Sequence, residues 1–103
     1  TYVDNVVHAN LLAMASDKPM GGQVINIACG QRVTVNQLAT RMAALLGRAD
    51  LQPVYKPERA GDVKHSLADL SRAKVVLGYE PIVGFEEGLA ATVAGYKNPN
   101  AET

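Results

Sequence analysis

The sequence has one cysteine, Cys29, no tryptophan and no apolar run long enough to cross a bilayer. A single cysteine excludes an internal disulfide and fits a reducing compartment. The first residues also lack the basic head and apolar stretch of a secretory signal peptide. These features lead us to expect a cytoplasmic protein.

An excess of charge of one sign is also lacking. Ten basic and ten acidic side chains cancel, so no broad field would attract nucleic acid or an anionic membrane. Because 48% of the 103 residues are apolar and 19% are charged, the composition is that of an ordinary globular protein. The length predicts one domain, which we expect over residues 1–97, with a flexible tail over 98–103.

Two kinds of site motif are missing as well. The sequence contains no G-x-G-x-x-G, the fingerprint that places a dinucleotide pyrophosphate at a helix N-terminus. His8, Cys29 and His65 are too far apart in the chain to predict a zinc site. We therefore assign no cofactor-binding and no metal-binding residue to this chain.

Apolar periodicity and helix-end signals predict four helices. Thr34 with Gln37 forms a capping box, and Gly47 and Gly78 are typical helix-ending residues. The apolar stripe of the last helix includes Tyr96. The expected first and last residues are Asp4 to Ser16, Thr34 to Gly47, Asp69 to Gly78 and Phe85 to Tyr96.

Short strands are expected over Gln23–Ala28 and Pro53–Tyr55, with a possible third over residues 63–66. The fold class predicted from these elements is α/β. It is a mostly helical small domain with about four helices and two or three short strands. Strands this short form a poor sheet without further partners.

The most informative segment, residues 56–66, is a charged loop between two helical segments. Arg59 is a candidate anion ligand because its planar guanidinium can bind a phosphate in bidentate fashion. Gly61 allows a close approach of backbone and ligand, and Asp62 is placed to hold Arg59 or to accept from a hydroxyl. The alternative is a solvated turn with one surface ion pair, which is common and weak.

Structural roles account for the other polar candidates. We expect a structural hydrogen bond for His65. We expect a structural role for Asn26, which either bonds the backbone of a neighbouring loop or fills a polar position on a strand. The remaining expectations are helix caps at Asp4 and Asp69, helix packing or surface exposure for His8, a buried or half-buried thiol at Cys29, a core position for Tyr55, and helix-dipole stabilisation at Glu86 and Glu87.

Six strings, in order and over nearly the whole chain, resemble one enzyme family. The chain is similar to the carboxyl-terminal, substrate-binding part of the NAD-dependent nucleotide-sugar epimerases and dehydratases, which are extended short-chain dehydrogenases. The likeness is greatest to UDP-glucose and UDP-N-acetylglucosamine 4-epimerases. The strings are Tyr2–Val7, Asn26–Gly30, Arg59–Val63, Ala68–Ser71, Leu77–Pro81 and Phe85–Leu89.

This resemblance implies that Arg59 contacts the diphosphate of a UDP-sugar and that Asp62 contacts the ribose or supports Arg59. The family's catalytic Tyr-x-x-x-Lys pair is absent from the sequence, so we assign no catalytic residue. NAD is implied for full-length members only, and we expect this chain alone to be inactive. Epimerase, dehydratase and decarboxylase activities of a parent enzyme, and the identity of its sugar, stay open.

Two alternatives remain at this point. The chain is a stand-alone module with weak affinity for nucleotides, or it is an interaction or dimerisation domain without a ligand. The family's cofactor domain would cover the first helix, so its absence would leave apolar surface exposed. We therefore expect a homo-oligomer that forms through this cofactor-domain face, with exchange of the first helix as one route.

Overall fold

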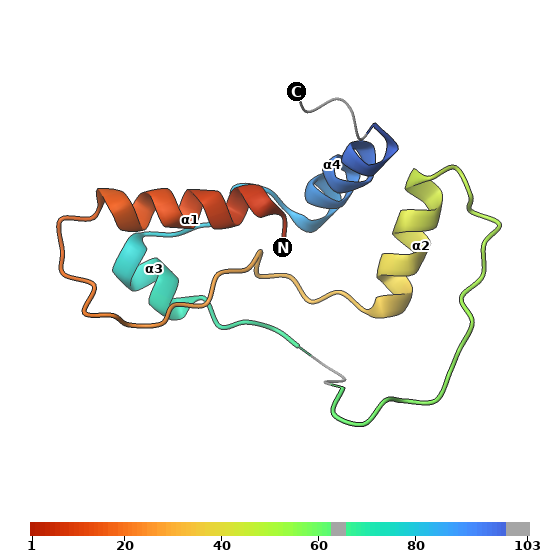
Figure 1. Ribbon diagram of the computed structural model, residues 1–103, viewed down its shortest axis with the longest axis horizontal. Coiled ribbons are helices and arrows are strands. Elements are labelled where there is room, and N and C mark those ends of the chain that lie inside the picture. Colours follow the sequence, from red (N-terminus) through yellow and green to blue (C-terminus); the bar gives the residue numbers. More distant parts are fainter. Residues whose placement is uncertain (63–65, 99–103) are drawn as a thin grey trace.

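The computed structural model describes residues 1–62 and 66–98, and it contains four helices within them (Figure 1). α1 and α3 lie together at one end of the molecule, and α2 and α4 lie at the other. The helices are α1 (Val3–Ala15), α2 (Val35–Leu45), α3 (Ser71–Leu77) and α4 (Phe85–Lys97).

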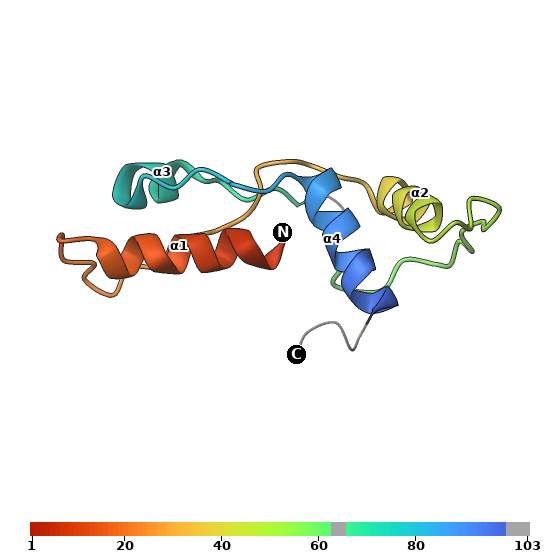
Figure 2. The same ribbon diagram turned by 90° about the horizontal axis from the view of Figure 1, so that it is seen from above.

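The molecule is flat and open. Its principal extents are 51 × 40 × 19 Å, and its radius of gyration is 16.8 Å, whereas a compact chain of this length would have a value of about 13 Å. Figure 2 shows α3 stacked on α1 at one end, with α2 and α4 at the other. Long connecting segments join the two helix pairs, so each pair has its own small set of contacts.

The prediction of a mostly helical small domain with about four helices is confirmed, but the predicted short strands are not seen, because the described residues contain no strand. Gln23–Ala28 and Pro53–Tyr55 follow the chain as irregular segments without a β-ladder. A strand exists only when a second backbone supplies its hydrogen-bond partners, and neither segment has one. The third expected strand, residues 63–66, lies outside the described residues except for Ser66.

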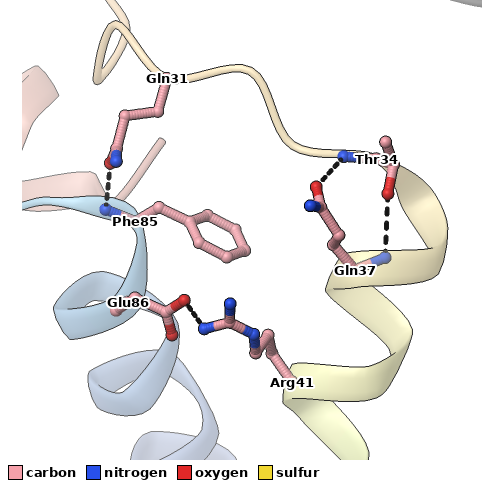
Figure 3. Close-up of polar contacts among 6 residues, drawn as sticks. All are labelled: Gln31, Thr34, Gln37, Arg41, Phe85 and Glu86. Carbon is pink, nitrogen blue, oxygen red and sulfur yellow. Dashed lines mark hydrogen bonds and ion pairs between the residues drawn. The ribbon is translucent and has the colours of Figure 1, made fainter.

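The helix ends follow the local signals in the sequence. The Thr34 hydroxyl accepts from the Gln37 amide at 3.0 Å, and the Gln37 side chain accepts from the Thr34 amide at 2.9 Å, which confirms the capping box (Figure 3). Gly47 follows α2 with φ 71°, and the amides of Gly47 and Arg48 bond back to the last turn. These contacts satisfy carbonyls that would otherwise lack partners.

Two expected caps have different outcomes. Asp69 is not the N-cap of α3, which is Leu70, but its carboxylate accepts from the amide of Ser71 at 2.9 Å and from the Ser71 hydroxyl at 2.6 Å, so it still satisfies a donor of the first turn. α3 ends at Gly78, which has φ 65°. Asp4 is not the N-cap of α1, because the helix begins one residue earlier and Tyr2 is the cap. Asp4 lies in the first turn, where the helix dipole favours a carboxylate.

The core is small and lies between α1 and α3. Ala9, Ala73 and Tyr79 are buried there. The partly buried side chains packed against them are Leu12, Ile25, Ile27, Leu70 and Leu77. At the other end Val93 of α4 is buried, whereas Tyr96 is 85% exposed, so its expected place in the apolar stripe of α4 is wrong.

Polar contacts hold α2 against α4. Arg41 of α2 pairs with Glu86 of α4 (Figure 3). Lys97 donates its Nζ hydrogen to the carbonyl of Leu45, the last residue of α2, at 2.9 Å. The Gln31 side chain accepts from the Phe85 amide at 2.9 Å, which satisfies the start of α4.

α1 buries one face and exposes apolar side chains on another. Its inner face carries Asn5 and Ala9, which are buried. Its outer apolar stripe consists of four exposed residues: Val3, Val7, Leu11 and Met14. No helix in the described part of the chain is long and apolar enough to span a membrane.

Candidate functional site

The charged loop forms a tight turn at its centre. The amide of Asp62 donates to the carbonyl of Arg59 at 3.2 Å, which closes a four-residue turn. Gly61, the third residue of that turn, has φ 86°, a backbone conformation that residues other than glycine rarely adopt. The glycine therefore allows the turn that brings Arg59 and Asp62 together.

The two predicted ligand residues are in contact. Arg59 Nε donates to Asp62 Oδ2 at 3.1 Å. The two side chains are 85% and 53% exposed, so the pair contributes little to stability, on the order of 0–1 kcal/mol. The pair instead orients the guanidinium. Because the bond to Asp62 uses Nε, it does not use the two Nη groups, which can donate together to an oxyanion in a bidentate contact.

A second exposed pair gives a useful comparison. Arg48 donates from Nε and Nη2 to the two carboxylate oxygens of Asp50, at 3.1 and 3.2 Å. This contact holds the pKa of Asp50 below its ordinary value. In contrast to Arg59, Arg48 uses a terminal Nη group in its intramolecular pair, so its guanidinium is less available for a bidentate anion.

The charged turn does not border the main hollows of the surface. A hollow of about 580 Å³ lies between Cys29–Gly30, residues 67–70 and the stretch from Lys74 to Pro81. Another of about 600 Å³ lies between the start of α1 and the outer side of α4. Neither is lined by Arg59 or Asp62, so the turn lies apart from these two hollows.

One amide in the first turn of each of the last three helices bonds to a side chain. The amide of Gln37 in α2 bonds to Thr34, that of Ser71 in α3 bonds to Asp69, and that of Phe85 in α4 bonds to Gln31. The assignment of no cofactor-binding residue to this chain stays a prediction. The described residues also contain no group of three His, Cys, Asp or Glu side chains that could hold a metal ion.

The other candidates occupy structural positions. Cys29 is half-buried and free, as expected, and the His8 ring packs near the Tyr79 ring with centroids 6.0 Å apart. Tyr55 is exposed, so its expected core position is wrong. Hydrogen bonds from Ser71 hold the pKa of Asp69 below its ordinary value. His65 lies outside the described residues.

Two buried polar side chains were missed by sequence reasoning. Asn5 donates to the carbonyl of Val83 at 2.8 Å and accepts from the amides of Ile82 and Val83 at 2.8 and 3.0 Å. Tyr79 donates to the carbonyl of Ala28 at 2.7 Å. The available signal was helical spacing, because Asn5 shares a face of α1 with Ala9 and Leu12, which belong to the core.

These contacts explain several of the six strings that resemble the family. Asn5 and Tyr79 each belong to one string and bond to the backbone in or beside another. Gly88, from the last string, lies against Tyr2 from the first. Most of the strings therefore mark packing positions, and Arg59–Val63 is the one string that contains a basic residue.

Comparison with known proteins identifies the family. No protein-family model matches the chain. It is 37% identical over 97 residues to the UDP-glucose 4-epimerase of Mycolicibacterium smegmatis, covering 94% of this chain and 30% of that protein. Other matches are named as UDP-sugar epimerases, decarboxylases and a dehydratase.

Two solved structures resemble the fold closely. The UDP-glucose 4-epimerase of Thermotoga maritima, solved with UDP-glucose, is 46% identical and superposes with a TM-score of 0.83. MoeE5, solved with UDP-glucuronic acid and NAD, is 35% identical with a TM-score of 0.82. The matches cover 96% of this chain but only 31% and 32% of those chains. The chain therefore belongs to the NAD-dependent nucleotide-sugar epimerase/dehydratase family and corresponds to the carboxyl-terminal part of its members.

Proposed function

We propose that this chain is the nucleotide-sugar-binding part of a UDP-sugar 4-epimerase-like enzyme that uses NAD. In the longer protein, Arg59 binds the diphosphate of the UDP-sugar. The observation that carries this proposal is the Arg59–Asp62 contact of 3.1 Å on an exposed glycine turn. A doubly charged diphosphate is bound best by a cationic group that is held in a fixed orientation. The guanidinium of Arg59, held through its Nε, is such a group.

Asp62 has two roles compatible with this geometry. It supports Arg59 through the bond to Nε, or it accepts from a ribose hydroxyl once Arg59 has turned towards the ligand. In both roles it acts beside Arg59 and takes no part in proton transfer. An Asp62→Asn variant keeps the size and the acceptor oxygen but loses the charge, so we expect weaker binding rather than loss of the turn.

An NMR titration of the labelled chain tests the binding site. UDP, UDP-glucose and UDP-N-acetylglucosamine should each shift amide signals in the segment 55–66, and Arg59→Ala should abolish the shifts. Arg48→Ala is the matched control, since it removes an exposed arginine that is also paired with a nearby aspartate. Unchanged spectra at ligand concentrations on the order of millimolar would contradict binding by this chain alone.

We propose that the chain alone does not catalyse epimerisation. Nicotinamide cofactors carry the hydride chemistry of such reactions, and the sequence holds neither the dinucleotide fingerprint nor the Tyr-x-x-x-Lys pair. The chain incubated with NAD and UDP-glucose should form no UDP-galactose. Turnover above a protein-free blank would contradict this proposal.

The exposed stripe of α1 favours a second candidate function, that of an interaction domain. We propose that the chain forms a homo-oligomer through this stripe, where Val7, Leu11 and Met14 lack a covering element among the described residues. Sedimentation should show association that Leu11→Glu abolishes. Asn36→Glu, at an exposed position of α2, should leave it unchanged, and a wild-type monomer at high concentration would refute the candidate.

Two further assignments complete the proposal. We propose a domain over residues 1–97 with a tail over 98–103, supported by the end of α4 at Lys97. We also propose a cytoplasmic location, because the free thiol of Cys29 suits a reducing compartment.

A further inference from the structure

The direction of the Arg59 side chain depends on the conformation of one glycine. Two bonds join the first and fourth residues of the charged turn: the Asp62 amide donates to the Arg59 carbonyl at 3.2 Å, and Arg59 Nε donates to Asp62 Oδ2 at 3.1 Å. Both bonds require the turn, and the turn requires the φ of 86° at Gly61. A positive φ at the third residue is typical of type II turns, where glycine is preferred.

Within this chain, glycine is needed at position 61 for its backbone and not for its small size. Apart from its sequence neighbours, no heavy atom of the described chain lies within 4 Å of a Cβ placed on Gly61. A methyl group would therefore fit beside the turn. The positive φ is the constraint, because an L-residue with a Cβ rarely adopts it.

The turn is separate from the elements that hold the fold together. Residues 46–62 are all exposed, whereas the buried cluster consists of Ala9, Ala73 and Tyr79. The two bonds of the turn join residues three positions apart, so they form without a distant element. A variant that opens the turn should therefore keep the rest of the fold, and its effect on ligand binding can be measured separately from its effect on stability.

We propose that Gly61 is a positioning residue for the diphosphate and acts through Arg59. Because Arg59 binds the diphosphate of a UDP-sugar in the proposed function, this role of Gly61 depends on that function. While the turn is closed, Asp62 holds the guanidinium at Nε, and both Nη groups are left to donate to phosphate oxygens. When the turn opens, that hold is lost, and the apparent affinity falls with the fraction of molecules in the closed state.

Three replacements separate the conformation of the turn from the space beside it. Gly61→Ala adds a methyl group and disfavours a positive φ, whereas Gly61→Asn adds a larger side chain that tolerates it. A D-alanine at the same position, introduced by chemical ligation, adds the same methyl group and favours a positive φ, because its chirality is inverted. In an NMR titration with UDP, Gly61→Ala should weaken binding about fivefold or more, and the other two replacements should stay within about twofold of the wild type.

The NMR signal of the Arg59 Nε–H group gives a second readout, which needs no ligand. In Gly61→Ala this signal should move towards its position in Asp62→Ala, which lacks the carboxylate that accepts from Nε. The asparagine and D-alanine replacements should leave it at its wild-type position. A loss of affinity in Gly61→Ala without a change in this signal would contradict an effect through Arg59.

Two further results with these variants would overturn the proposal. Equal losses of affinity in all three would show that the ligand needs the space beside Gly61, and wild-type affinity in Gly61→Ala would show that the turn does not matter. If UDP does not bind to the wild-type chain, the proposed function fails and this role fails with it. The two kinds of failure are therefore distinguishable.

Gly47 provides the matched control. It is exposed, has φ 71°, and has no described heavy atom within 4 Å of a Cβ placed on it, apart from its sequence neighbours. Gly47→Ala therefore introduces the same kind of backbone strain after α2, and it should lower the melting temperature while the affinity for UDP stays within about twofold of the wild type. An equal loss of affinity in Gly47→Ala and Gly61→Ala would show that backbone strain at either place weakens binding, and the positioning role would be refuted.

Discussion

Tyr79 donates its phenolic hydrogen to the carbonyl oxygen of Ala28 at 2.7 Å, across 51 positions of the sequence. The side chain of Tyr79 is fully buried in the core between α1 and α3. The bond holds the segment after α3 against the segment that precedes α2. Because Tyr79 belongs to the core cluster, the bond also holds that cluster together.

Removal of this hydroxyl should destabilise the fold. Tyr79→Phe keeps the ring but leaves the Ala28 carbonyl without its donor, which should lower the free energy of unfolding by about 1–2 kcal/mol. Urea denaturation followed by circular dichroism would measure the loss. Tyr96→Phe, at an exposed position of α4, is the control and should change stability by less than about 0.5 kcal/mol.

Tyr79 should also make the stability of the fold depend on alkaline pH. Burial raises the pKa of Tyr79 above its ordinary value, with smaller contributions from Cys29 and Glu80. The folded state therefore holds the phenolic proton more tightly than the unfolded state does. The contribution of Tyr79 to the free energy of unfolding is complete below pH about 10 and is lost as the pH rises through the pKa of the folded state. The stability advantage over Tyr79→Phe should therefore shrink above pH about 10, and a constant difference from neutral to alkaline pH would contradict this.

Asn5 should be the most sensitive polar residue of α1. Asn5→Ala removes three hydrogen bonds and leaves the backbone groups of Ile82 and Val83 without partners. We expect a loss of about 3 kcal/mol, or failure to fold. Asn10→Ala, at an exposed position of the same helix, should be neutral or slightly stabilising, and thermal melts of both variants would compare them.

Gly88 should tolerate no side chain. A Cβ at this position would lie 2.7 Å from Cβ of Tyr2, which cannot move away as the end of a long side chain could. Gly88→Ala should therefore destabilise the contact between α4 and the start of α1 by about 1–3 kcal/mol. Gly95→Ala in the same helix meets open space and should stabilise it by about 0.5–1 kcal/mol, so an equal effect of both changes in thermal melts would refute the close contact.

Local signals in the sequence predicted the local structure correctly. The capping box at Thr34, the left-handed Gly47 and Gly78, and the bond between Asp69 and the Ser71 amide depend on neighbours within a few residues, so the sequence contains all the information they require. The turn at Gly61 is local in the same way, and it explains why Arg59 and Asp62 meet as expected.

Tertiary structure decided the features that depend on distant partners. Gln23–Ala28 has strand composition, but its state depends on a second backbone that the described chain does not supply. The buried role of Asn5 depends on residues 82–83, far away in the sequence. The sequence by itself determined the helices, several of their ends and the charged turn, because these are settled within a few residues. Only the tertiary structure decided which faces are buried and which extended segments pair, because both require contacts between distant parts of the chain.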